Sequence, residues 1–204
     1  MRAIANEERA NDASLVDRFL EVAVELFGRR GYTGVSVEEI VEAAGVTKGA
    51  FYYYLESKAE LLYRIHDRFI SVELAEGERI LAGGGSASER LARLVRSLVR
   101  SIHDYLPYVT VFFHELHHLE EPYLSRIREK RDRYERMFVE TVAAGVAAGE
   151  FRDDVEPRLV ALALFGMCNW AYRWYRPDGP LGPEEIADRF LRLFMEGLAR
   201  RDGR

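Results

Sequence analysis

The sequence predicts an all-α protein with about nine helices, and its composition, capping signals and periodicity all point that way. Ala, Leu, Arg and Glu are abundant while β-branched residues are sparse, a balance that favours helix. Helix-capping signals recur along the chain, each followed by apolar residues at helical spacing. No segment shows the alternating pattern of a β-strand, and no internal repeat is present. At 204 residues the chain is long enough to bury a substantial core.

Three helices are expected in the first part of the chain, each opened by a Ser or Thr hydroxyl that can accept a hydrogen bond from a backbone N–H of the first turn. Ser14 opens a helix that stops at Gly31, and Ser36 begins a second helix that stops at Gly45. Thr47 caps a third, short helix with the sequence KGAFYYYL.

The remaining helices are separated by Gly and Pro, the residues that most strongly interrupt helices. Ser57 begins a long helix that runs toward the glycines at 83–85, and Ser86 begins the next one. Pro107 and Pro122 bracket a helix of about three turns. Further helices are expected over residues 123–149, over 157–175 and from about 183 onward.

Charge and composition describe an ordinary globular protein. A formal net charge of −5 argues against a surface coated in basic residues, although a local basic face is compatible with it. Cys168 is the single cysteine, so neither an intrachain disulfide nor a cysteine metal cage can form. The N-terminus lacks the apolar core of a signal peptide, and no apolar run approaches the roughly 18–20 residues that span a bilayer. We therefore expect a soluble, cytoplasmic protein without a membrane partner.

Residues 36–55 have the pattern of a helix-turn-helix, with Gly45 at the bend and Val46 closing the turn. The apolar residues of both helices fall on one side, which leaves hydroxyls, a cation and aromatic rings on the outer face of the second helix. In DNA-binding proteins such a face meets base edges and phosphates. The alternative is that the tyrosines pack on the first helix, and Tyr52 is the one best suited to that role. The outer face consists of Thr47, Lys48, Gly49, Tyr52, Tyr53 and Tyr54.

Residues 14–62, centred on GYTGVSVEEIVEAAGVTKGAFYYYLESKAELL, closely resemble the DNA-binding domain of TetR-family transcriptional regulators. The resemblance implies a DNA-binding domain over 1–58 and a ligand-binding and dimerisation domain over 59–204. It also implies a dimeric repressor that binds a palindromic double-stranded DNA operator, uses no cofactor and catalyses no reaction. By position, the residues nearest the bases would be Thr47, Lys48, Gly49 and Tyr53, and those holding phosphates would be Ser36, Tyr52, Tyr54 and Lys58.

The last two helices are the expected homodimer interface, because pairing them between two chains would make a symmetric four-helix contact. Packing inside one subunit is the alternative for each of their apolar residues. The candidates are Ala161, Leu164, Phe165 and Cys168 on one helix and Ile186, Phe190, Leu193, Phe194 and Leu198 on the other.

The stretch MCNWAYRWYRPDGP at 167–180 combines indole rings, which can stack on a purine, with guanidinium groups, which suit phosphates. Together with FFHELHHL it resembles the C-terminal domain of TetR-type repressors that respond to acyl-CoA thioesters. The resemblance implies release from the operator by an acyl-CoA effector; a non-CoA hydrophobic ligand, or a structural role at the dimer rim, is the alternative. The expected effector residues are Phe112, Phe113, His114, His118, Met167, Trp170, Arg173, Trp174 and Arg176.

His114, Glu115 and His118 also match H-E-x-x-H, the helical signature of many zinc hydrolases. A third ligand would have to come from Glu135 or Glu140, whose helix is already explained by packing and solvation. We therefore expect no metal, and we expect the two histidines to line or rim an effector cavity. A DNA-binding activator or an architectural protein without a ligand stays open, as do the effector's identity, the operator sequence and the regulated genes.

Overall fold

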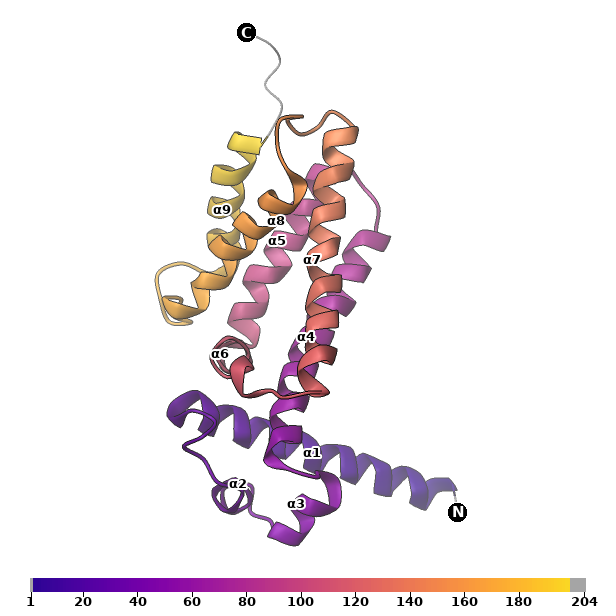
Figure 1. Cartoon of the computed structure of the whole chain (residues 1–204), viewed down its shortest axis with the longest axis vertical. Helices are drawn as coiled ribbons and strands as arrows, with labels where there is room; N and C mark the ends of the chain where they lie inside the picture. Colours follow the sequence, from indigo (N-terminus) through magenta and orange to yellow (C-terminus); the bar gives the residue numbers. More distant parts are fainter. Residues whose placement is uncertain (1, 199–204) are drawn as a thin grey trace. The chain divides into compact units, whose positions relative to one another are not determined.

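The computed structural model describes the backbone of residues 2–198 and the side chains of residues 15–198. Within this part of the chain nine α-helices and two short 3-10 helices follow one another, which confirms the predicted all-α class (Figure 1). No helix among the described residues is both long and apolar enough to cross a membrane. The elements are α1 (Arg2–Arg30), α2 (Val37–Ala43), α3 (Lys48–Tyr54), α4 (Lys58–Ala82), α5 (Ala87–Asp104), α6 (Leu106–His114), η1 (Leu116–His118), α7 (Tyr123–Ala147), α8 (Pro157–Asn169), η2 (Trp170–Arg173) and α9 (Pro183–Leu198).

Two compact units make up the fold. Unit 1 contains the residues up to Phe69 together with Pro107–Ile127, so it includes α1 to α3, the start of α4, nearly all of α6, η1 and the start of α7. Unit 2 contains Ile70–Leu106 and the residues from Arg128 onward, with α5, α8, η2, α9 and the rest of α4 and α7. The division at residue 58 that the sequence predicts is one of function, and it stays a prediction.

Local capping sets the starts of three helices where the sequence predicts them. Ser36 Oγ accepts a hydrogen bond from the Glu39 N–H at 3.2 Å, and the Glu39 carboxylate accepts one from the Ser36 N–H at 2.8 Å, which completes the capping box of α2. Ser86 caps α5 in the same reciprocal way. Thr47 Oγ1 accepts from the Ala50 N–H at 3.2 Å and begins α3.

Two early helices depart from their predicted bounds. α1 runs through Ser14 instead of beginning there, because the preceding Ala- and Glu-containing segment itself favours helix. The three-turn helix expected between Pro107 and Pro122 is broken. Glu115, with φ −106° and ψ 4°, ends α6, and η1 follows it. The bend buries Glu115 and Leu119 in unit 1.

The helix predicted over 157–175 is α-helical only as far as Asn169, after which the chain tightens into η2. Trp174 leaves helical geometry with φ −123°. Pro177 favours an early end, because the residue before a proline is disfavoured in the helical region. The sequence predicts that Trp170 and Trp174 stand one α-helical turn apart on one face, and this prediction is wrong because the α-helix ends before them.

The core of unit 2 is built around α5, which packs chiefly against α9 and α8. Its inward residues recur every three or four positions, the spacing of one helical face. Figure 1 shows α5 running within the bundle of C-terminal helices. The fully buried residues of this stripe are Leu91, Leu94 and Val95, and Phe138, Phe151, Ala161 and Leu164 from other elements of the unit are buried as deeply.

Candidate DNA-binding surface and effector site

The inner side of α3 is fixed firmly to unit 1. Phe51 is fully buried, and its ring packs edge-on against Phe19 of α1 at 5.3 Å. Leu55, the C-cap residue of α3, is buried as well. Gly45 has φ of 65°, a left-handed conformation that glycine adopts without strain, so α2 can turn into α3 within a few residues.

The outer side of α3 faces solvent. Tyr53 is 78% exposed and Tyr52 is 51% exposed, and Thr47, Lys48 and Gly49 are exposed at the N-terminal end of the helix. The sequence alternative, in which all three tyrosines pack on the first helix, therefore does not hold. Tyr54 is half-buried, with its ring edge-on to that of Tyr53 at 4.7 Å. The predicted face thus projects from a rigid base.

Lys48 is not isolated on this surface. Its Nζ donates a hydrogen bond to the Glu38 carboxylate of α2, which forms an exposed ion pair. The hydrogen bond from Lys48 lowers the pKa of Glu38, and the same bond raises the pKa of Lys48. Nζ also lies 6.0 Å from the centre of the Tyr52 ring. The sequence analysis did not single out Glu38, because a Glu in a first helical turn is ordinary capping chemistry.

Two of the expected phosphate contacts have structural partners. Ser36 is the N-cap of α2 and is engaged with Glu39. Lys58 Nζ donates hydrogen bonds to the carbonyl oxygens of Tyr32 at 2.9 Å and Val35 at 2.7 Å. It also lies 4.1 Å from the centre of the Tyr32 ring, a cation–π contact. Burial lowers the pKa of Lys58. This lysine therefore holds the segment between α1 and α2 to the start of α4.

Arg18 of α1 is a cation near the turn that the sequence analysis missed. Its Nη2 lies 3.4 Å from the position that a Cβ would take at Gly45, and its side chain is exposed. Only the packing of α1 beside the α2–α3 turn brings the two residues together, because they are distant in sequence. Arg18 is a further candidate for phosphate contact.

The expected effector residues fall into two groups, one in each unit. In unit 1, Phe112 is buried, with ring centres 5.0 Å from Phe69 and 5.5 Å from Phe113. His114 is exposed. His118 packs on the Tyr32 ring at 5.2 Å. His118 thus lies against the segment that Lys58 holds, and Phe112 belongs to the core of unit 1.

The second group lies on the surface of unit 2. Trp170 is 61% exposed and Trp174 is 46% exposed. The Arg173 guanidinium lies 5.7 Å from the centre of the Trp170 ring, and Trp174 meets Phe190 edge-on at 6.3 Å. Arg176 is exposed and Met167 is half-buried. Both tryptophan rings and both guanidinium groups are therefore exposed on unit 2, and their role in binding an effector stays a prediction.

The exposed apolar surface of the last two helices matches the predicted interface only in part. Leu193 of α9, an interface candidate, is exposed, and so are Leu159 and Leu162 of α8, which are not among the candidates. Phe165, Phe190 and Phe194 are half-buried. Periodicity identifies stripes on a helix, but it does not say which stripe faces its own subunit. The interface candidates that are instead buried within unit 2 are Ala161, Leu164, Cys168, Ile186 and Leu198.

The H-E-x-x-H match does not form a zinc helix. His114 ends α6 and His118 ends η1, so the two imidazoles do not share the continuous α-helix that the signature requires. Glu115 between them is buried, 3.5 Å from His118 Nε2. Among the residues that the structure describes, no three His, Cys, Asp or Glu side chains gather into a group that could hold a metal ion.

Unit 2 contains a buried carboxyl that the sequence analysis did not identify. Glu73 of α4 accepts a hydrogen bond from the Tyr134 hydroxyl of α7 at 2.9 Å. Burial raises the pKa of Glu73 to about 7, although the hydrogen bonds with Tyr134 and Ser101 act in the opposite direction. The signal was present in the sequence, because Glu73 lies on the same helical stripe as Phe69, Gly77 and Ile80, all of which are buried.

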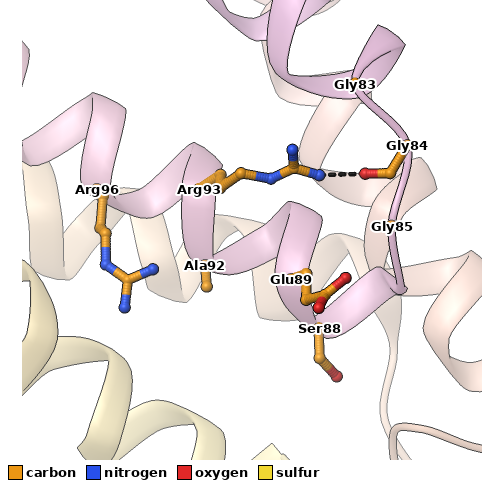
Figure 2. A pocket seen from close by; sticks show the side chains of 8 residues that line it. All are labelled: Gly83, Gly84, Gly85, Ser88, Glu89, Ala92, Arg93 and Arg96. Atoms are coloured by element: carbon orange, nitrogen blue, oxygen red, sulfur yellow. Dashed lines mark hydrogen bonds between the residues drawn. The ribbon is translucent and has the colours of Figure 1, made fainter.

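A surface depression of about 570 Å³ lies where the glycines at 83–85 meet α5 (Figure 2). Its charged groups already have partners. The Arg93 guanidinium is directed at the Gly84 carbonyl, to which it donates a hydrogen bond. Arg96 bonds Asp188 at 2.8 Å, and Glu89 accepts from the Ser86 N–H. The contacts of Arg93 and Glu89 hold the glycine loop to the start of α5, and the Arg96 contact joins α5 to α9.

Two short helices joined by a glycine turn, with the outer face of the second exposed, are the arrangement of a helix-turn-helix DNA-binding motif. Residues 19–65 match the family model described as bacterial regulatory proteins, tetR family. Residues 84–198 match the model described as tetracyclin repressor-like, C-terminal domain. The chain therefore belongs to the TetR family of transcriptional regulators, and it is not an enzyme. Family membership and the broken helix together remove the zinc-hydrolase alternative.

Similar proteins include repressors and a ligand-bound structure. The HTH-type transcriptional repressor KstR2 of Mycolicibacterium smegmatis is 25% identical over 201 residues, which cover 98% of each chain. The structure of the ketosteroid transcriptional regulator KstR2 of Mycobacterium tuberculosis matches with a TM-score of 0.85 at 26% identity, over 91% of this chain and 95% of that one. AibR, solved with isovaleryl coenzyme A and operator DNA, matches with a TM-score of 0.80 at 27% identity, over 88% and 97%.

Proposed function

We propose that the protein is a ligand-responsive repressor that binds a palindromic operator as a dimer and is released by a small-molecule effector, an acyl-CoA thioester. The observation that carries the DNA-binding part is the exposed face of α3, held from behind by the buried Phe51. A rigid helix with solvent-facing hydroxyls, rings and one cation suits a major groove. The repressor would act in the cytoplasm, where chromosomal DNA lies.

The DNA contacts follow from where the side chains lie. Thr47, Lys48 and Gly49 at the N-terminal end of α3, and Tyr53 near its C-terminal end, are exposed and would approach the bases. The expected phosphate contacts are Tyr52, Tyr54, Ser36 and Lys58, and Arg18 joins them because its guanidinium lies beside the α2–α3 turn. Ser36 and Lys58 would contribute chiefly by fixing the local backbone, since both already have protein partners.

A dimer through α8 and α9 is supported by their exposed leucines. Leu193 is 73% exposed, Leu159 62% and Leu162 45%, and burying such apolar side chains is the main driving force for association. A symmetric pairing of the two helices would set two copies of α3 against two half-sites. Half-sites separated by one turn of DNA, or by a multiple of it, would make the operator palindromic.

The acyl-CoA assignment rests on chemistry and on likeness. Trp170, Trp174, Arg173 and Arg176 gather rings and cations on unit 2, a set suited to a nucleotide. AibR, a similar structure, was solved with isovaleryl coenzyme A and operator DNA. Release would require the effector to favour the non-binding state by roughly 5 kcal/mol. A hydrophobic effector without coenzyme A is the alternative.

The proposal can be tested by fluorescence anisotropy with labelled fragments from upstream of the gene. Specific binding should weaken as salt rises, with a logarithmic slope of about −0.9 per phosphate contact. Tyr53→Ala should weaken binding about tenfold or more, while Tyr105→Ala, which alters an exposed tyrosine at the end of α5, should leave it unchanged.

The effector is tested by adding acyl-CoAs, their free acids and unrelated hydrophobic compounds to the bound complex. Release by acyl-CoAs alone is the expected result. Release only by the unrelated compounds would overturn the acyl-CoA assignment and leave the DNA-binding function standing. Failure of the wild-type protein to select any DNA sequence would overturn the function itself.

A further inference from the structure

Glu38 and Lys48 join the two helices of the helix-turn-helix on their solvent side. Glu38 lies in the first turn of α2, Lys48 is the first residue of α3, and the ammonium donates to the carboxylate. The side chains are 62% and 53% exposed, respectively, so the pair fills no core. Exposed ion pairs contribute little to stability, and this one therefore has little structural role.

A carboxylate on a DNA-facing surface is unfavourable, because phosphates repel it. Neighbouring Glu39 has a structural reason to be there, since it completes the capping box with Ser36 and bonds Arg30 at 2.7 Å. Glu38 takes no part in that capping box; it lies in the first turn of α2, where an acid is favourable, and its side-chain partner is Lys48 at the start of α3. The specific feature of Glu38 is therefore that its carboxylate lies beside the Lys48 ammonium.

The major-groove edge of a G·C pair is complementary to a lysine that lies beside a carboxylate. Guanine presents two adjacent acceptors, N7 and O6, and the cytosine amino donor comes next to them. A lysine beside a carboxylate presents the complementary order, donors next to an acceptor. At an A·T pair the two acceptors are separated by the adenine amino group, and a thymine methyl occupies the edge. A charged pair fits that pattern poorly.

We propose that Glu38 and Lys48 read one G·C base pair in each operator half-site, with Lys48 donating to guanine and Glu38 accepting from the cytosine amino group. Glu38 is then a specificity-determining residue on α2, outside the recognition helix. Gly49, which follows Lys48, has no side chain to keep the backbone of α3 away from the bases. The inference rests on the proposed function, because it needs α3 in the major groove.

Recognition of a G·C pair by Glu38 and Lys48 also predicts the effect of removing the Glu38 carboxylate. In Glu38→Ala the cation of Lys48 loses its charged partner and becomes available to phosphates of any sequence. Binding to non-operator DNA should tighten and its salt dependence should steepen, by about 0.9 in slope for each phosphate gained. Discrimination at the G·C position should fall by about tenfold or more, since a good contact to one base separates right from wrong by roughly 5- to 150-fold.

The experiment uses the full chain and selection from a randomised DNA pool, followed by anisotropy on the selected operator and on versions with single base pairs exchanged. The matched control is Glu42→Ala, which removes the same charge from another exposed position of α2. Wild type and control should require G·C at one symmetric position, and Glu38→Ala should bind while losing that requirement alone. Lys48→Met should lower discrimination at the same position.

Three outcomes overturn the inference. The first is an unchanged base preference in Glu38→Ala with binding tightened as in the control, which would mean that Glu38 contributes only its charge. The second is a Glu38→Ala variant that loses discrimination equally at every position, which would indicate a structural role. The third is an operator that has no G·C requirement affected by either residue. A wild type that selects no sequence at all refutes the proposed function, and that result is distinct from all three.

Discussion

Replacing Glu73 with Gln should stabilise the protein at neutral and alkaline pH. The carboxyl is buried in unit 2, and burial raises its pKa from the ordinary value of 4.5 to about 7. Glu76, the other charged group that acts on it, raises the pKa further. Gln has the same shape and is never charged, so it removes the cost of burying an ionised group.

The sign and size of the change in the free energy of unfolding follow from proton linkage. Below pH 4.5 the carboxyl is protonated in the folded and the unfolded chain, so it contributes no pH dependence there. Between pH 4.5 and about 7 the unfolded chain has lost the proton and the folded chain has kept it, so the free energy of unfolding falls as pH rises. At about 1.4 kcal/mol per pH unit, this window amounts to about 3 kcal/mol. Above pH 7 the carboxyl is ionised in both states, and the free energy of unfolding no longer changes with pH through this group.

Gln can also satisfy the neighbouring groups. Its carbonyl oxygen can accept from the Tyr134 hydroxyl, as the carboxyl does at 2.9 Å. Its amide can donate to Ser101 Oγ, whose own hydroxyl donates to the Leu98 carbonyl at 2.9 Å. Tyr134→Phe is the contrasting variant, because it removes a donor from a buried carboxyl and should destabilise by about 1–3 kcal/mol.

Urea denaturation from pH 4.5 to 8, followed by tryptophan fluorescence, measures the effect. Both tryptophans lie in unit 2, as Glu73 does, so the signal reports on the correct part of the chain. The free-energy difference between Glu73→Gln and wild type should be near zero at pH 4.5 and grow to about 3 kcal/mol at pH 8. Other titrating groups cancel in this difference. Parallel profiles for the two proteins would refute the reasoning.

Three further outcomes are expected. Phe51→Ala should cost about 3–5 kcal/mol by thermal denaturation, because the ring is fully buried, and retention of full stability would contradict the anchoring of α3. Leu193→Glu should leave the fold intact by circular dichroism while shifting the mass measured by light scattering toward a monomer, whereas a persistent dimer would place the interface elsewhere. Ser86→Ala should lower stability by about 1 kcal/mol in urea titrations through loss of the α5 cap, and an unchanged midpoint would mean that Glu150, which accepts from the Ala87 and Ser88 N–H groups, suffices to cap α5.

Features set by local chemistry were predictable from the sequence. Ser36, Thr47 and Ser86 begin helices because each hydroxyl meets an N–H within its own first turn. The outward face of α3 followed from its own periodicity, with Phe51 inward and Tyr53 outward. The match to H-E-x-x-H was correctly discounted, although the break at residue 115 was not foreseen.

Features set by distant contacts were not predictable. Lys58 has a cation that suits phosphate, but its partners are carbonyls more than twenty residues away, near Tyr32. On α8 the sequence offers several apolar stripes, and only the packing around α5 decides that Leu164 is inside while Leu162 is outside. Single-sequence reasoning cannot choose between such stripes, because both have helical spacing.

The bonds of Lys58 have a mechanical consequence. Its ammonium donates hydrogen bonds to two carbonyls of the link between α1 and α2, and its backbone begins α4. The link is therefore bound to the first turn of α4 through this one side chain. A displacement of the first turn of α4 cannot leave that link behind without breaking both bonds. Because that link leads directly into α2, a movement at the start of α4 would also displace the helix-turn-helix.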